Sequence, residues 1–168
     1  MLGGIFNIRF LSKSEIRGWP MFGWLSTSSG TLFIERGKGS EQSNDVITGV
    51  LQQGDNVMIF PEATTSDGLG VKPFHPRLFK SAIAAQKPVI PVMISYLTDH
   101  QPNRDIAWTL ERSFAQTIWH ILGSWRTEVQ VHCFAPVSSA GLSRKELARR
   151  CHVEIRERLE SRITAGRR

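Results

Sequence analysis

Short apolar runs alternate with helix-like periodicity along the first hundred residues. The apolar runs cover residues 31 to 35, 57 to 60 and 88 to 96, and turn residues bound each of them. Runs of this length are typical of strands, and the unbroken run at 57 to 60 is typical of a strand buried on both faces. Residues 40 to 53 and 76 to 86 have a period near that of a helix instead. Strands that alternate with helices predict an α/β layer architecture.

The apolar positions of the two predicted helices fall on one face each. Gly54 follows the first helix, where glycine is favoured as a C-terminal cap because it readily takes a positive φ. Pro91 interrupts the third apolar run, so we expect that strand to be irregular or near a sheet edge. The residues expected to face inward are Val46, Ile47, Val50 and Leu51 in the first helix and Leu78, Phe79, Ala82 and Ile83 in the second.

The last third of the chain predicts a strand and a long helix. Residues 127 to 134 alternate Val129, Val131 and Cys133 with polar side chains, as a strand with one buried face does. Residues 143 to 163 carry apolar side chains at every fourth position, which places those side chains in one stripe along a helix. The stripe consists of Leu147, Cys151, Ile155, Leu159 and Ile163.

The predicted C-terminal helix opens with two helix-start signals. Ser143 and Glu146 have the spacing of a capping box, and Leu142 and Leu147 have the spacing of a hydrophobic staple. The other faces of the helix are rich in arginine. Such a helix could lie on anionic lipid. Because glutamates intervene between the arginines, it could equally be a solvated helix that packs through its apolar stripe.

A polar loop follows the predicted strand at 57 to 60. Pro61 ends the apolar run, and then come Glu62, Thr64 and further hydroxyl residues. Ligands in open α/β sheets bind just beyond the carboxyl ends of strands, which makes this loop a candidate site. The alternative is a solvated loop in which Thr64 or Ser66 caps the next element.

Length and composition favour one domain in a reducing compartment. The chain has 168 residues, 40% of them hydrophobic, which is enough to bury a full core. We therefore expect residues 1–168 to form one domain that ends in the basic helix at 143–163. Two cysteines are too few for a disulfide framework. Each has a histidine beside it, but neighbouring side chains diverge on strands and helices, so we expect no metal site.

The net charge of +6 indicates an anionic partner. Nucleic acid, anionic lipid headgroups and phosphorylated substrates all qualify, and charge alone does not choose among them. The sequence has no recognisable nucleic-acid-binding motif. A basic nucleic-acid-binding domain is therefore the weaker alternative from a different functional class.

Four segments occur in the order found in one enzyme family. They read F-L-S-K-S-E at 10–15, L-F-I-E-R at 32–36, G-D-N-V-M-I-F-P-E-A-T-T-S-D-G at 54–68 and K-P-V-I-P-V at 87–92. Together they resemble sequence blocks of the phospholipid/glycerol acyltransferase family, which includes the lysophosphatidic acid acyltransferases. The F-P-E block, followed by small and hydroxyl residues, is the most specific of the four.

The resemblance implies a fold, a reaction and a location. The fold would be α/β, a glycerolipid-acyltransferase-like layered sheet with flanking helices. The reaction would move a fatty acyl group from acyl-CoA or acyl-carrier protein (acyl-ACP) to a lysophospholipid such as 1-acylglycerol-3-phosphate, in phospholipid biosynthesis. No bound cofactor is implied, because the thioester is a co-substrate. The expected partners are the acceptor, the thioester and an anionic membrane surface at its cytoplasmic face, with no nucleic acid.

The resemblance also implies four substrate-binding residues. Lys13 and Arg36 are suited to holding the phosphate of the acceptor, lysine as a point charge and arginine through a bidentate fork. Glu62 and Thr64 would belong to the network that contacts the acceptor or orders the loop. The residues alone leave other interpretations open. Lys13 and Arg36 could be surface cations at strand ends, and Glu62 could pair with Arg36 for structural reasons.

The chain departs from the family pattern at two places. Ala63 stands where the family normally has glycine, and a methyl group is tolerable there unless the backbone needs a positive φ. The family's first block is a His-x4-Asp whose histidine would act as general base on the acceptor hydroxyl. It is expected upstream of Lys13, where this chain has neither histidine nor aspartate. The same spacing at His100 and Asp105 lies after the fourth block and contains Pro102, so we interpret it as chance.

The sequence therefore assigns no catalytic residue to this chain. Three hypotheses account for the missing block. The native start lies further upstream, the coding sequence is truncated, or the protein is a catalytically inactive lipid- or phosphate-binding relative.

Overall fold

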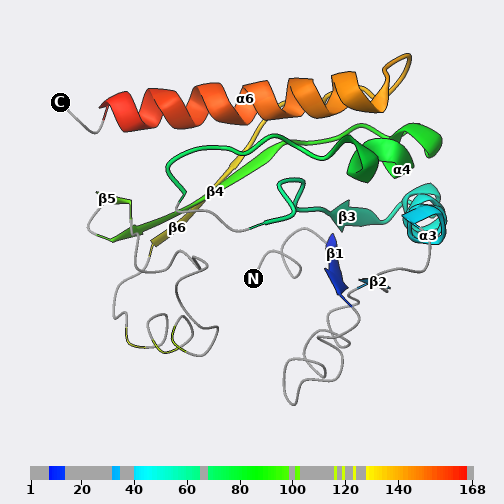
Figure 1. The fold of residues 1–168 in the computed structure, drawn as a ribbon, viewed down its shortest axis with the longest axis horizontal. Coiled ribbons are helices and arrows are strands. Elements are labelled where there is room, and N and C mark those ends of the chain that lie inside the picture. Colours follow the sequence, from blue (N-terminus) through cyan, green and yellow to red (C-terminus); the bar gives the residue numbers. More distant parts are fainter. Residues whose placement is uncertain are drawn as a thin grey trace.

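The computed structural model of the chain describes residues 8–13, 32–34, 40–64, 68–98, 101–102, 116, 119, 123 and 128–165. Helix α6 lies along one side of the molecule, with strands β4 and β6 beneath it (Figure 1). The described elements are mixed α/β, as the sequence predicts. In chain order they are β1 (Ile8–Lys13), β2 (Leu32–Ile34), α3 (Ser40–Gln52), β3 (Asn56–Met58), the 3-10 turn η2 (Pro76–Phe79), α4 (Lys80–Ala84), β4 (Val92–Thr98), β5 (Gln101–Pro102), β6 (Glu128–Cys133) and α6 (Arg144–Ala165).

The first three strands form a parallel sheet in the order β2-β1-β3. In the first half of β1, Phe10 lies opposite Met58 of β3, and in the second half Lys13 lies opposite the end of β2. An ion pair of 2.7 Å between Arg9 and Asp55 joins β1 to the start of β3. Because the strands are parallel, Lys13 and the loop after β3 lie toward the same end of the sheet.

Strand β3 is shorter and more exposed than its apolar run predicts. It covers Asn56–Met58 rather than 57 to 60, and its residues Val57 and Met58 are only half-buried. The side chain of Phe60 is 57% exposed. Among the described strands β3 pairs only with β1, so it lies at an edge where fewer neighbours cover its side chains. The prediction of a strand buried on both faces is wrong here.

The second sheet is antiparallel, in the order β5-β4-β6. The pairing of β4 with β6 runs from Val92 opposite Cys133 to Leu97 opposite Glu128. Strand β4 begins directly after Pro91. The run at 88 to 96 is divided at Pro91 into an isolated bridge at Val89 and strand β4, as predicted for an irregular strand, but β4 lies between β5 and β6 and not at an edge.

Helix α6 covers one face of this antiparallel sheet. The Arg162 guanidinium donates from Nη1 to Ser95 Oγ over 3.1 Å and from Nη2 to Gln130 Oε1 over 2.8 Å. On the other face of the sheet Val129 and Val131 are exposed, Val129 by 49%. The prediction that these valines form the buried face of the strand is wrong, because the helix packs over the alternate, polar positions.

The most deeply buried residues join α6 to η2 and the segment around it. Phe79, Leu147, Ala148 and Cys151 form one cluster of buried side chains. The partly buried residues packed around this cluster are Phe74, Leu78, Ile83, Val89, Val137 and Leu142. The inward direction predicted for Phe79, and for the first half of the C-terminal stripe, is therefore confirmed.

Helix α6 starts as its sequence signals predict. It begins at Arg144, and the N–H of Glu146 donates to Ser143 Oγ over 3.2 Å, as in an N-cap. Leu142 packs against the cluster that contains Leu147, as a hydrophobic staple requires. None of the helices in the described part of the chain is both long and apolar enough to cross a bilayer.

Helix α3 ends in the glycine cap that the sequence predicts. Gly54 has a φ of +91°, and its N–H donates to the carbonyl of Leu51 over 3.2 Å. The N–H of Asp55 donates to the carbonyl of Val50 over 3.3 Å. These two bonds make a Schellman motif, which satisfies carbonyls at the end of the helix.

One residue of the predicted inner face of α3 points outward. Ile47 is buried, but the side chain of Val46 is 57% exposed. The helix is oriented by its contact with α4, where the Ser81 hydroxyl lies 3.1 Å from both the carbonyl oxygen and Oδ1 of Asn44. Asn44 and Ile47 are three residues apart and share a face, whereas Val46 lies on the other side of the helix.

The helix predicted over 76 to 86 is divided into η2 and the short helix α4. Gln86 follows α4 with a φ of +53°, and its N–H donates to the carbonyl of Ile83 over 3.0 Å. The N–H of Lys87 donates to the carbonyl of Ala82 over 3.0 Å. This is the motif that ends α3, with glutamine at the position where glycine is favoured.

Candidate functional site

A tight turn follows β3 and begins the candidate loop. The N–H of Ala63 donates to the carbonyl of Phe60 over 3.1 Å, which closes a four-residue turn. Pro61 occupies the second position of this turn, where its fixed φ is favourable. Glu62 therefore occupies the third position, and its carboxylate projects from a turn rather than from a strand.

Ala63 is held in a left-handed conformation, with a φ of +53°. A residue with a β-carbon is destabilised there by roughly 1–2 kcal/mol. The family pattern has glycine at this position. Because the φ of residue 63 is positive, the methyl group of alanine is unfavourable here. The turn at Pro61 and Glu62 therefore contains local strain, which the contacts of the surrounding loop must offset.

Two hydrogen bonds close the loop that starts at this turn. The Lys72 N–H donates to Glu62 Oε2 over 3.1 Å, and the His75 N–H donates to the carbonyl of Pro61 over 2.9 Å. The two bonds connect the turn to residues 10 and 14 positions further along the chain. Glu62 is half-buried, so its carboxylate organises the loop backbone from inside the loop.

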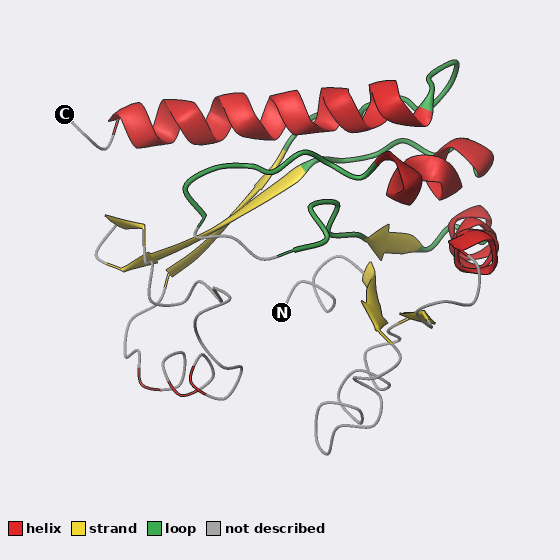
Figure 2. Cartoon of the chain, in the orientation of Figure 1, coloured by secondary structure: helices red, strands yellow, loops and turns green. Residues whose placement is uncertain are grey.

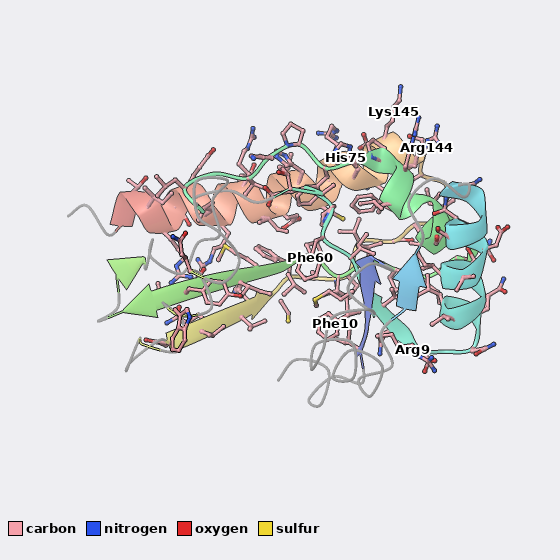
Figure 3. The ribbon with its side chains drawn as sticks, turned by 60° about the horizontal axis from the view of Figure 1, so that its bottom comes forward. Arg9, Phe10, Phe60, His75, Arg144 and Lys145 are labelled. Atoms are coloured by element: carbon pink, nitrogen blue, oxygen red, sulfur yellow. The ribbon has the colours of Figure 1, made fainter. Side chains whose placement is uncertain are left out.

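Helix α6 holds the same loop from outside. His152 Nε2 lies 3.2 Å from the carbonyl oxygen of Val71. The His152 ring meets the Phe74 ring edge-on, with 5.2 Å between ring centroids, and Phe74 stacks on Phe79. Figure 2 shows the last part of this loop, which leads into η2, running alongside α6. Figure 3 shows its last residue, His75, near the first turn of that helix.

The four predicted binding residues are not all brought together in the described structure. Glu62 lies in the loop just described, and Thr64 is exposed beside it. Lys13 ends β1. It lies three positions after Phe10, the residue that pairs with Met58 of β3, and therefore about 10 Å further along the strand. Arg36 lies outside the described residues, as do His100 and Asp105. The roles of the four residues remain predictions.

Among the described residues, the ionisable groups with a clearly shifted pKa lie on α6 and not in the loop. Hydrogen bonds from Arg149 and then Arg150 lower the pKa of Glu146 to about 2. Burial raises the pKa of Cys151 to about 11, which makes that thiol a packing residue and not a nucleophile. Cys133 is exposed on β6. In the described part of the chain, no three His, Cys, Asp or Glu side chains gather in a group that could hold a metal ion.

Comparison with known proteins identifies the family. The sequence profile of a family described as Acyltransferase matches residues 1–95, more than half of the chain. The chain belongs to the acyltransferase family. The matched part of this acyltransferase-family chain includes Lys13, Arg36, Glu62 and Thr64, and the family resemblance of the four sequence blocks is confirmed.

Curated relatives extend the likeness beyond the family match. The chain is 39% identical over 157 residues to a lyso-ornithine lipid O-acyltransferase of Pseudomonas aeruginosa, covering 93% of the chain and 61% of that protein. It is 31% identical over 155 residues to a 1-acyl-sn-glycerol-3-phosphate acyltransferase of Neisseria gonorrhoeae, covering 91% of the chain and 60% of that protein. This acyltransferase-family chain thus spans about 60% of the length of these relatives.

A solved structure supports the fold. The crystal structure of the 1-acyl-sn-glycerophosphate acyltransferase PlsC from Thermotoga maritima superposes with a TM-score of 0.61 at 21% identity. The superposition covers 91% of this acyltransferase-family chain and 56% of the solved one. The predicted α/β acyltransferase-like fold is confirmed.

One residue near the loop was not assigned a role by the sequence. The sequence places His152 beside Cys151 and predicts no metal site there, yet His152 contacts the loop that carries Glu62. The only available signal was its place beside Cys151 in the apolar stripe, which predicts a half-buried side chain. Its partner, 81 residues away in sequence, leaves no local pattern.

Proposed function

We propose that the protein transfers a fatty acyl group from a thioester of CoA or ACP to the hydroxyl of a lysolipid. The acceptor oxygen attacks the thioester carbonyl, a C–O ester bond forms, the C–S bond breaks, and the thiol leaves with the proton. The observation that carries this proposal is the family match over residues 1–95, which includes the ordered turn at Pro61 and Glu62.

The proposed acceptor is lyso-ornithine lipid, with 1-acylglycerol-3-phosphate as the second candidate. The relative acting on lyso-ornithine lipid is 39% identical, and the relative acting on 1-acyl-sn-glycerol-3-phosphate is 31% identical. Both acceptors offer a hydroxyl and an anionic group, a carboxylate in the first and a phosphate in the second. An arginine fork binds either group, so Arg36 is compatible with both.

Each predicted site residue has a proposed role. Lys13 and Arg36 hold the anionic group of the acceptor, Glu62 shapes the loop through the Lys72 N–H, and exposed Thr64 contacts the acceptor. No residue of this chain is assigned as the base that removes the acceptor proton. We expect attachment to the membrane to be peripheral, through the basic surface of the protein.

An acyl-transfer assay on the purified protein tests the proposal. The protein is incubated with palmitoyl-CoA or palmitoyl-ACP and either lysolipid in mixed micelles. Thiol release and the diacyl product are measured together. We expect product with at least one donor and acceptor pair. The Glu62→Gln variant should form less product. Glu157 is an exposed carboxylate on α6, and the Glu157→Gln variant should form as much product as the wild type.

Two outcomes would contradict the proposal. Saturable lysolipid binding without product from any of the four pairs would identify a binding-only relative. Neither binding nor product, together with an affinity for duplex DNA that falls steeply with salt, would favour the nucleic-acid alternative instead.

A further inference from the structure

We propose that His152 of α6 is a positioning residue for the acceptor, because it fixes the peptide group that orients Glu62. This inference rests on the proposed function, since it takes the loop at Glu62 to be part of the acceptor site. His152 does not itself lie in that loop. It comes 81 positions after Val71, the loop residue that it contacts.

The first step is the contact between the ring and the backbone. His152 Nε2 lies 3.2 Å from the carbonyl oxygen of Val71. A carbonyl only accepts hydrogen bonds, so Nε2 must carry the proton. The neutral ring with its proton on Nε2 and the doubly protonated ring both donate here. The contact therefore fixes the role of this nitrogen as a donor.

The second step is that one peptide group carries both contacts. The carbonyl of Val71 and the N–H of Lys72 belong to the same planar peptide unit. His152 binds its oxygen, and Glu62 Oε2 binds its N–H over 3.1 Å. Because a trans peptide directs its C=O and N–H to opposite sides, α6 and Glu62 hold this plane from opposite sides. A bond to the carbonyl also polarises the peptide and strengthens its N–H as a donor.

The third step is that the His152 ring is itself held by the core. The Phe74 ring meets it edge-on at 5.2 Å between centroids and 87° between planes. Phe74 stacks on Phe79 at 6.3 Å, and Phe79 is almost completely buried in the cluster that contains Leu147. The ring thus cannot turn away from Val71 without disturbing that contact. Glu62 is oriented by a series of contacts that begins in the core.

Two substitutions at His152 separate the effect of the hydrogen-bond donor from the effect of the aromatic ring. His152→Phe keeps an aromatic ring against Phe74 but removes the hydrogen-bond donor. His152→Gln removes the ring but keeps an N–H donor of similar reach. The matched control is His132→Phe, because His132 also meets a phenylalanine edge-on, Phe134 at 4.6 Å, but lies on β6.

The first measurement is local and independent of any activity. Amide hydrogen exchange is followed at Lys72 in the full chain, together with the carbonyl ¹³C shift of Val71. We expect His152→Phe to speed exchange at Lys72 by about tenfold or more and to shift the Val71 carbonyl. His152→Gln should largely restore both signals, and His132→Phe should change neither. Unchanged signals in His152→Phe would overturn the inference.

The second measurement is acceptor affinity. Phosphatidylcholine vesicles that carry lyso-ornithine lipid or lysophosphatidic acid serve as probes, and KM and kcat are compared where turnover is measured. We expect His152→Phe to weaken acceptor affinity or raise acceptor KM by about tenfold, with the KM of the thioester unchanged. His152→Gln should recover most of the loss, which a general packing defect would not allow.

The two measurements distinguish the failure of this inference from the failure of the proposed function. If Lys72 exchange speeds up but affinity for both lysolipids is unchanged, the contact exists and the loop is not the acceptor site, which overturns the positioning role. If wild-type protein binds neither lysolipid while the Lys72 and Val71 signals respond to His152→Phe, the proposed function fails and the structural part of the inference holds.

Discussion

The two halves of α6 share one apolar stripe but contact the rest of the protein in different ways. In the first half Leu147 and Cys151 are buried against Phe79. In the second half the stripe is only half-buried, and the guanidinium of Arg162 donates to Ser95 and Gln130. The first half is thus held by full hydrophobic burial, whereas the second half combines partial burial with polar contacts to a sheet.

The difference shows what a helical stripe does and does not determine. A repeat at every fourth position fixes which face of the helix turns inward. The element it meets decides how deeply that face is buried. Opposite the first half stands a buried phenylalanine, and opposite the second half stands the sheet face that contains Ser95 and Gln130 together with the buried Met93 and Leu97. We expect the first half to contribute most of the stability of the contact.

The largest expected effect comes from removing the buried leucine of the first half. Leu147→Ala should lower the free energy of unfolding by about 3 kcal/mol, because it leaves a cavity in a closed cluster. Leu159→Ala, at the same stripe position in the half-buried part, should cost only about 1 kcal/mol. Urea denaturation followed by circular dichroism measures both. Equal losses would mean that the two halves are held alike.

The next effect concerns the polar contact of the second half. Arg162→Met keeps the aliphatic stem but removes both donors, and it should cost about 1–2 kcal/mol because Ser95 and Gln130 are only half-buried and can bind water instead. Arg158→Met, an exposed neighbour, should change stability by less than about 0.5 kcal/mol. A loss as large as that of Leu147→Ala would contradict the comparison.

A smaller effect, a gain in stability, is expected in the loop that contacts the first half of α6. Ala63→Gly should raise the free energy of unfolding by about 1 kcal/mol, because glycine takes the observed φ of +53° without strain. Gln86→Gly relieves the same conformation away from the site and should stabilise by a similar amount. Thermal unfolding measures both gains. A loss of stability in both variants would show that neither residue is strained.

The smallest effect is the pH dependence of the first turn of α6. The folded-state pKa of Glu146 is lowered to about 2, chiefly by its hydrogen bond with Arg149. A lowered folded pKa gives stability that is present above the unfolded pKa and is lost as pH falls through about 2. The melting temperature of wild-type protein should therefore fall slightly more between pH about 4.5 and about 2 than that of Glu146→Gln. Glu157→Gln should follow the wild type.

Elements and family could be predicted from the sequence because both depend on local patterns. Strands β2, β3, β4 and β6 and the long helix were located by apolar runs and periodicity, and Ser143, Gly54 and Pro91 marked boundaries that the structure confirms. The family was recognised from four short blocks in order. The roles of Lys13, Arg36, Glu62 and Thr64 came from that resemblance and remain predictions.

The errors about which face of an element turns inward share one physical cause. Alternation along β6 gives the strand two faces but does not say which one a helix will cover, so Val129 and Val131 were placed inward although Gln130 meets Arg162. Val46 was misplaced for the same reason. The contact of His152 with Val71 could not be predicted, because no local pattern encodes a partner 81 residues away.

The contrast between the two cysteines makes the protein easy to label at one place. Cys133 is exposed on the sheet face turned away from α6, whereas Cys151 is buried and its pKa is raised to about 11. Near pH 8 only about one in a thousand Cys151 thiols would be ionised, even without the barrier of the core. A maleimide fluorophore should therefore attach to β6 alone. Its emission would report whether that side of the molecule approaches a lipid surface.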